Sequence, residues 1–175
     1  MSQRPSLGSA LRLAASAAGL TMLLLAPAAA RAKRLAGWGA SAGLFDLSQE
    51  EEAVEIGVDY GFRELAMAWG LAPVVGLGAT TDEAVFAYAG LRRPFELGGG
   101  SWHLVPSLAV TLFDRGEGKD LGQTLQFRSG LELRRQLRGG AQVGAGIYHI
   151  SNSSMDDINP GANSLLLRLV LPRGR

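Results

Sequence analysis

Hydrophobic and polar residues alternate along several stretches of this chain. Between Val54 and Arg63 every second residue is a valine, isoleucine, tyrosine or phenylalanine, and the residues between them include Glu55 and Asp59. Successive side chains of a β-strand point to opposite faces, so this stretch predicts a strand with one apolar face and one charged face. Residues 124–137 repeat the pattern, with leucines and a phenylalanine opposite glutamine, arginine and glutamate. The second face of such strands is too charged for a dry protein core.

Six further segments show weaker forms of this alternation, at residues 35–45, 65–79, 84–91, 103–113, 141–151 and 164–172. The sequences between them are rich in Gly, Asp, Asn and Pro, which favour turns. No segment after residue 32 has the roughly 18 consecutive apolar residues of a transmembrane helix. The sequence therefore predicts an all-β fold of eight antiparallel strands in a single domain.

Strands with one apolar and one charged face are typical of a small transmembrane β-barrel of the outer-membrane type. Such a barrel turns its apolar face to lipid and its polar face to a narrow lumen. The expected lumen residues, paired with one another, are Glu55, Asp59, Arg63, Gln126, Arg128, Glu132, Arg134 and Arg168. Candidate aromatic residues for the membrane interface are Trp38, Tyr60, Phe62 and Trp69. A soluble eight-stranded barrel with an apolar interior has the same periodicity and stays open as an alternative.

The first 32 residues predict an export signal. Arg4 and Arg12 lie in a leader without acidic residues, residues 13–30 are an apolar segment, and Ala30-Arg31-Ala32 has the form of a signal-peptidase site. We therefore expect residues 1–32 to be a signal peptide and residues 33–175 to form one barrel domain in the cell outer membrane. The apolar segment is close to the length of a membrane span, so an uncleaved anchor is the alternative.

Charge and composition exclude several classes of function. The first 32 residues hold three arginines and no acidic residue, so the remaining chain has 17 − 3 = 14 basic and 16 acidic residues. A net charge of 14 − 16 = −2 does not suit a nucleic-acid partner. The chain has no cysteine, which excludes disulfides and thiolate metal sites, and its two histidines and scattered acids do not form a metal-binding pattern. We expect neither a metal nor a cofactor, and we place His103 on the lumen face.

The stretch "YHISNSSMDDINPGANSLLLRLVLP", residues 148–172, carries candidate chemistry. His149 and Ser151 share the apolar, lipid-facing side of their strand, and Asn163 shares the side of the leucines in the next strand. If the two strands pair as a hairpin, the three side chains lie together on the outer surface. A serine nucleophile needs a base, and that base needs an orienting partner. The alternative is that His149 and Ser151 are interfacial polar residues that end a strand.

At these residues the chain resembles the PagL lipid A 3-O-deacylases of Gram-negative outer membranes. The resemblance extends over residues 95–172 and is clearest in "YHISNSS" and "NPGAN". It implies that His149 is the base, that Ser151 is the nucleophile and that Asn152 supports the reaction, in the manner of an oxyanion-binding group. The stretch "DLGQTLQFRSGLEL", residues 120–133, is similar to the strand that precedes the catalytic hairpin of the family.

The third member of the catalytic group departs from the family pattern. Asn163 stands where the family has a glutamate. An asparagine can accept a hydrogen bond from the histidine and fix its tautomer, but it cannot stabilise an imidazolium by charge. We expect Asn163 to fill the role, with Asp156 or Asp157, in the loop between the two strands, as alternatives.

The resemblance implies an outer-membrane serine esterase that hydrolyses the 3-O-linked 3-hydroxyacyl ester of lipid A. Its partners would be lipopolysaccharide, the surrounding outer-membrane lipid and a second copy in a homodimer, and it would need no cofactor. A non-catalytic outer-membrane barrel with a structural or adhesive role is the main alternative, and a soluble lipid-carrying barrel is another.

Overall fold

The computed structural model describes residues 36–47, 53–65 and 70–173. The expected signal peptide at residues 1–32 and the interfacial candidate Trp69 lie outside the described residues. The described strands are β1 (Gly37–Phe45), β2 (Ala53–Gly61), β3 (Ala72–Thr80), β4 (Val85–Arg92), β5 (Phe95–Leu97), β6 (Trp102–Asp114), β7 (Leu125–Gln136), β8 (Gln142–Ser151) and β9 (Ala162–Pro172). Among these residues, no helix has the length and apolar character needed to cross a membrane.

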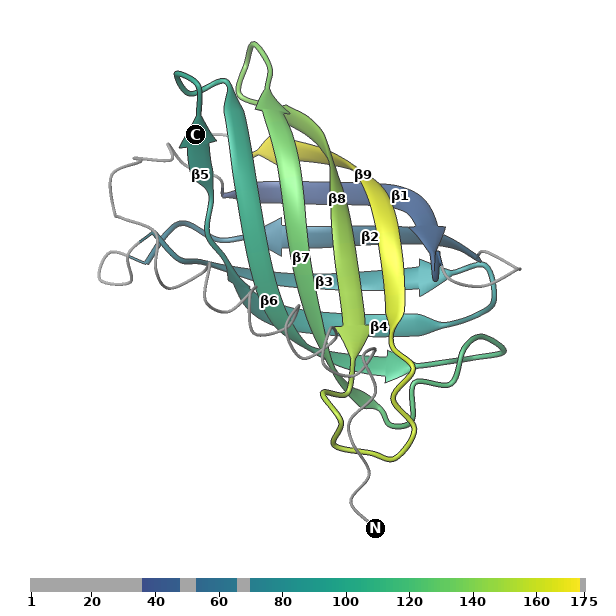
Figure 1. The fold of residues 1–175 in the computed structure, drawn as a ribbon. Coiled ribbons are helices and arrows are strands. Elements are labelled where there is room, and N and C mark those ends of the chain that lie inside the picture. Colours follow the sequence, from purple (N-terminus) through teal and green to yellow (C-terminus); the bar gives the residue numbers. More distant parts are fainter. Residues whose placement is uncertain (1–35, 48–52, 66–69, 174–175) are drawn as a thin grey trace.

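The strands form one antiparallel sheet that closes on itself. Its order is β4-β3-β2-β1-β9-β8-β7-β6-β5, and β4 also pairs with β6, which joins the two edges (Figure 1). β5 is a three-residue strand that pairs with β6 beyond the end of β4. Eight strands therefore make the wall of the barrel, which confirms the predicted fold class.

The structure differs from the sequence prediction in the start of one strand and in one additional short strand. The strand expected at residues 65–79 begins only at Ala72. Before it, the Leu65 amide donates to the Leu71 carbonyl, and Gly70 has a φ of 81°, which is outside the range of a β-strand. β5 was not predicted, because its three residues lie in a stretch rich in turn-forming residues, and its place is fixed by pairing with β6.

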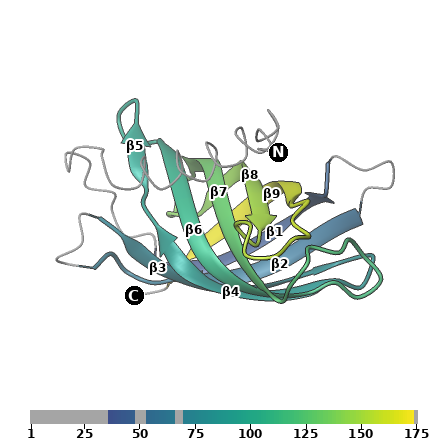
Figure 2. The ribbon, with the colours of Figure 1, turned by 60° about the horizontal axis from the view of Figure 1, so that its bottom comes forward.

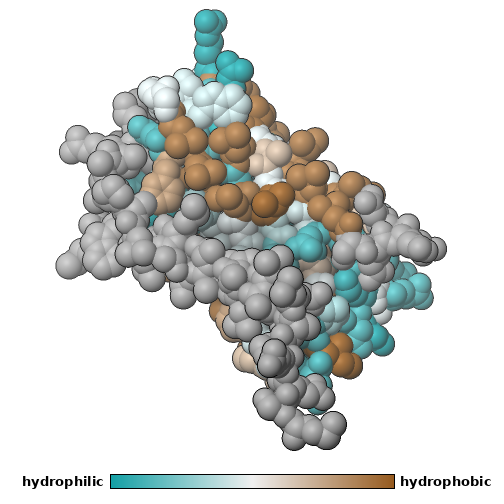
Figure 3. Space-filling model, in the orientation of Figure 1, coloured by the Kyte–Doolittle hydropathy of each residue, from teal (hydrophilic) through white to brown (hydrophobic). Residues whose placement is uncertain are grey.

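The outer face of the barrel is apolar, as the alternation predicted. In β2 the side chains of Val54, Ile56 and Val58 are exposed and those of Glu55 and Asp59 are buried. In Figure 3, brown apolar residues gather over the strands that grey atoms do not cover, and teal polar residues lie toward the ends. An apolar exterior around a charged interior rules out the soluble barrel with an apolar core.

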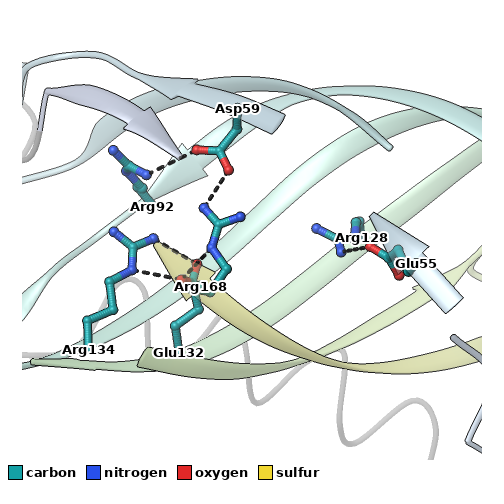
Figure 4. Close-up of polar contacts among 7 residues, drawn as sticks. All are labelled: Glu55, Asp59, Arg92, Arg128, Glu132, Arg134 and Arg168. Atoms are coloured by element: carbon teal, nitrogen blue, oxygen red, sulfur yellow. Dashed lines mark hydrogen bonds and ion pairs between the residues drawn. The ribbon is translucent and has the colours of Figure 1, made fainter. Parts of the chain in front are cut away.

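The lumen is filled by a network of ion pairs (Figure 4). Glu132 accepts two hydrogen bonds from Arg134, at 2.7 and 2.9 Å, and a third from Arg168 at 3.2 Å. Arg168 also reaches Asp59, which Arg92 approaches at 3.7 Å from the other side. These side chains and their neighbours leave a cavity of only about 20 Å³ between them.

A second buried ion pair lies closer to the loops that follow β8. Arg128 pairs with Glu55 at 2.7 Å, and its guanidinium lies 3.9 Å from the ring centroid of Tyr148. Most of the expected lumen residues are confirmed, with three differences. Arg63 is exposed beyond the end of β2, and the buried Arg92 of β4 is a lumen residue that was not predicted. Gln126 is buried but bonds to backbone carbonyls instead of to a charged group.

An apolar layer closes the lumen at the end where β8 finishes and β9 begins. Phe45 and Phe86 both stack on Phe113 with centroid distances of 6.3 Å. Leu121, from the loop between β6 and β7, packs into the same buried cluster. Figure 2, turned to bring this side forward, shows the β6–β7 and β8–β9 loops near each other at the mouth of the barrel. The cluster holds the loops against the strands that carry the candidate catalytic residues.

Candidate functional site

His149 and Asn163 face each other across the β8–β9 hairpin. They are direct partners in the antiparallel register, and Nδ1 of His149 lies 3.0 Å from Oδ1 of Asn163. Both side chains belong to the outward-facing set, since the register continues with Ile147 opposite Leu165. The pairing brings two of the predicted residues together on the lipid-facing surface.

This hydrogen bond fixes the chemistry of the imidazole. An amide oxygen accepts but does not donate, so the bond requires the proton of the neutral ring to be on Nδ1. Nε2 then carries the free lone pair and can accept a proton from a nucleophile. Asn163 thus supplies an orienting acceptor without a negative charge.

Ser151 is the last residue of β8 and lies on the same face as His149, two residues nearer the loops. It is opposite Phe127 of β7, and its side chain is only 7% exposed. Residues two apart in a strand have Cα atoms about 7 Å apart. Within the described residues no hydrogen bond joins Ser151 to His149. Such bonds are often long without substrate and shorten when substrate binds.

Asn152 is fully buried and links two loops to the end of β8. Its side-chain nitrogen donates to the carbonyls of Leu121, at 3.0 Å, and Ile158, at 2.7 Å. Its side-chain oxygen accepts from the Ser154 amide at 3.0 Å. Both amide hydrogens are therefore in use, and the oxyanion role expected for this side chain would require one of these bonds to break. The arrangement instead suits a residue that positions Ser151 and the loops beside it.

Gly161 was not singled out by the sequence analysis, yet its backbone packs against the imidazole. A Cβ at this position would lie 2.8 Å from Cε1 and 3.3 Å from Nε2 of His149. Gly161 also has a φ of 64°, a conformation that favours glycine. The motif "NPGAN" contains the signal, since a glycine next to a proline marks a turn, but sequence alone does not show what the turn touches.

The two loop aspartates lie apart from the histidine. Asp156 is exposed and accepts a hydrogen bond from the Ile158 amide at 3.0 Å, and Asp157 is also exposed. Neither has a hydrogen bond to His149 in the part of the chain that the structure describes. Of the three candidates for the orienting residue, Asn163 is the one in contact with His149.

One more polar residue belongs to this surface. Ser129 of β7 is the direct partner of His149 on the side opposite Asn163. The alternation of residues 124–137 places Ser129 on the apolar face, so its position on the outer surface could be predicted from the sequence. In the described ranges, no three histidine, aspartate or glutamate side chains gather in a way that could hold a metal ion.

Comparisons with known proteins identify the fold and the family of this chain. The family model for lipid A 3-O-deacylase (PagL) matches residues 47–172. The crystal structure of the outer membrane enzyme PagL is similar in fold, with a TM-score of 0.66 and 17% identity over 78% of this chain and 99% of that one. A de novo designed transmembrane β-barrel has a TM-score of 0.50 and 11% identity, covering 79% and 95% of the two chains. No curated protein is significantly similar in sequence. With a family match over most of its length and the matching fold, this outer-membrane β-barrel belongs to the PagL family of lipid A 3-O-deacylases.

Proposed function

We propose that this protein hydrolyses the ester that links a 3-hydroxyacyl chain to the 3-position of lipid A, with Ser151 as nucleophile and His149 as base. The observation that carries the proposal is the hydrogen bond of 3.0 Å between His149 and Asn163 on the lipid-facing side of a PagL-family barrel. A histidine held in one tautomer beside a serine is the arrangement that serine hydrolases need.

In the first half of the reaction, Oγ of Ser151 attacks the ester carbonyl while its proton passes to Nε2 of His149. The bond between the carbonyl carbon and the sugar oxygen then breaks, and that oxygen takes the proton from Nε2. The acyl chain is left as an ester on Ser151. Asn163 keeps the imidazole aligned throughout, because Nδ1 remains hydrogen-bonded to its side-chain oxygen.

In the second half, a water molecule gives a proton to Nε2 of His149 as its oxygen attacks the acyl-enzyme. The bond to Oγ of Ser151 breaks, Oγ recovers the proton, and a free 3-hydroxy fatty acid leaves. We propose that Asn152 acts as a positioning residue, since its bonds to the Leu121 and Ile158 carbonyls hold the loops on either side of Ser151.

The position of the site supports a lipid as substrate. From His149 toward the middle of the strands, the next outward side chains are those of Ile147 and Leu165, which are 58% and 44% exposed. In the other direction, the polar loop begins at Asn152. Ser151 therefore lies where the apolar band meets the loops, which is the level at which an acyl ester joins a sugar headgroup.

Mass spectrometry of lipid A tests this proposal directly. Gram-negative cells that lack such an activity would express the full chain, and their lipid A would be compared with that of cells carrying an empty vector. We expect a new lipid A species that has lost one 3-hydroxyacyl group, together with the free fatty acid. Unchanged lipid A from cells with properly folded, outer-membrane protein would favour the non-catalytic barrel.

Variants at position 163 test the orienting role. Asn163→Ala should lower the rate by about tenfold, the value of one hydrogen bond that fixes the base. Asn163→Glu should raise it by about tenfold, because a charged hydrogen bond is roughly twice as strong as a neutral one and the carboxylate stabilises the imidazolium. Rates of fatty-acid release from lipid A micelles would be compared. A larger loss in Asp156→Ala or Asp157→Ala than in Asn163→Ala would assign the role to an aspartate.

Gly161→Ala should also lower activity, by roughly 10- to 100-fold, since a displacement of about 1 Å can cost on the order of 100-fold in rate. The new methyl group would have to push the imidazole away, as it would lie 2.8 Å from Cε1 of His149. Gly98→Ala is the matched control, because Gly98 has a φ of 56° but nothing within 4 Å of an added Cβ. Equal activities of the two variants would show that contact between position 161 and His149 does not affect the rate.

A further inference from the structure

The polar side chains on the outer face of the barrel form one small group. Along the described strands, outward positions carry apolar or aromatic residues, apart from Asp114 and Arg135 near the ends of β6 and β7. The exceptions that remain are Asn163, His149, Ser151 and Ser129. The proposed mechanism gives roles to the first three and none to Ser129.

The strand register places Ser129 beside the catalytic histidine. Asn163, His149 and Ser129 form one row across β9, β8 and β7, each the direct partner of the next. Cβ atoms of such partners are about 4.5 to 5.5 Å apart. Ser151 is the partner of Phe127, so it is the diagonal neighbour of Ser129, at a distance of about 7 to 8 Å.

The Ser129 hydroxyl makes no hydrogen bond with any described residue. A hydroxyl that faces lipid without a partner is unfavourable, and a polar residue in such a place marks a functional site more often than a structural one. The next outward residue of β7 toward mid-membrane is Leu131, opposite Ile147. On the outer face of β7, Ser129 is thus the last polar residue before the aliphatic surface formed by Leu131 and Ile147.

We propose that Ser129 is a specificity-determining residue that hydrogen-bonds the hydroxyl on the third carbon of the acyl chain. This inference rests on the proposed function. With the carbonyl at Ser151 and the tail directed toward Leu131 and Ile147, the chain passes Ser129 within its first few carbons. The Ser151 side chain, the carbonyl and one or two further carbons span the diagonal between the two serines. The first polar substituent of the chain then meets the Ser129 hydroxyl, which has no hydrogen-bond partner among the described residues.

Ser129 thereby distinguishes hydroxylated from plain acyl chains. A hydroxylated chain satisfies the Ser129 hydroxyl, and a plain chain of the same length leaves it unpaired in an apolar contact. Sites that hydrogen-bond a substrate hydroxyl discriminate against analogues that lack it, because the partner left behind is not solvated. A small side chain at position 129 also leaves room for the chain next to His149, which a leucine there would fill.

The experiment uses two 3-O-acyl glucosamine esters that differ only in the hydroxyl on the third acyl carbon. The full-length protein in detergent micelles would be assayed for kcat/KM on each ester, and the ratio of the two values is the readout. We expect the wild type to favour the hydroxylated ester by about two- to tenfold. Ser129→Ala should bring the ratio close to one, mostly through KM. Ser129→Thr keeps the hydroxyl and should keep the preference. Ser129→Val has nearly the shape of the threonine variant but no hydroxyl, and should lose the preference.

Ser101→Ala, in the turn before β6, is the matched control and should keep the wild-type ratio. Heat-modifiable migration on a gel verifies that each variant is folded. A ratio that Ser129→Ala leaves unchanged would overturn the inference while hydrolysis by the wild type upheld the proposed function. Loss of activity on both esters in the folded Ser129→Ala and Ser129→Val variants would overturn it in favour of a direct role in the chemistry. Failure of the folded wild type to cleave either ester, with lipid A also unchanged, would remove the proposed function and the inference together.

Discussion

Alanine in place of Ser151 or of His149 is expected to abolish the release of 3-hydroxy fatty acid, lowering the rate on the order of 10⁴-fold or more. Ser151→Ala removes the atom that forms the acyl-enzyme. His149→Ala removes the group that accepts its proton and returns it to the sugar oxygen. Because the two residues act in one step, the double variant should be no slower than either single variant. Fatty-acid release and the lipid A mass spectrum measure the effect.

These substitutions should leave the barrel intact. Among the described residues, Ser151 and His149 make no ion pair in the lumen, and the side-chain hydrogen bond given up is that of His149 with Asn163. Heat-modifiable migration should therefore match that of the wild type. Ser101→Ala serves as the control for an ordinary serine replacement far from the site. Substantial activity in folded Ser151→Ala would assign the nucleophile elsewhere, with Ser129 as the first residue to examine.

Glu132→Ala is expected to destabilise the barrel by about 3 to 5 kcal/mol, the usual cost of removing one partner of a buried ion pair. Glu132 accepts bonds from both Arg134 and Arg168, and all three side chains are buried. Without the carboxylate, two guanidinium groups face each other in a lumen with little room for water. Urea unfolding in lipid vesicles, followed by heat-modifiable migration, measures the change in free energy.

Matched variants separate the charge effect from the loss of volume. Glu132→Gln keeps the shape and a hydrogen-bond acceptor, so it should destabilise less than Glu132→Ala. Glu117→Ala removes an exposed loop glutamate and should change stability by less than about 0.5 kcal/mol. If Glu132→Ala and Glu117→Ala unfolded at the same urea concentration, the lumen network would not contribute to stability as argued.

The sequence predicted the wall of the barrel well, because alternation of apolar and charged residues is a local property that survives folding. Val54, Ile56 and Val58 had to face one way and Glu55 and Asp59 the other. It predicted less well where a turn competes with a strand. The start of β3 depends on the bond between Leu65 and Leu71, and β5 exists only through its pairing with β6.

In the candidate site, too, contacts between neighbouring strands could be predicted and contacts made by loops could not. The pairing of His149 with Asn163 follows from two strands joined as a hairpin, and spacing alone was enough to suggest it. Asn152 and Gly161 owe their contacts to loops that fold back on β8, and their paths depend on the apolar cluster around Leu121. Their roles therefore could not be derived from local pattern. The outward position of Ser129 could be predicted from the sequence, since the alternation places it on the same face as the lipid-facing leucines.

The ion pairs inside the barrel also affect the permeability of the membrane that contains it. Wide barrels are permeable because their lumen is a water-filled channel. Here the cavity among the lumen ion pairs has a volume of only about 20 Å³, room for about one water molecule, and an apolar layer lies at one end of the barrel. We therefore expect solutes larger than water not to pass between these side chains, so added copies of the barrel should change the permeability of the membrane little.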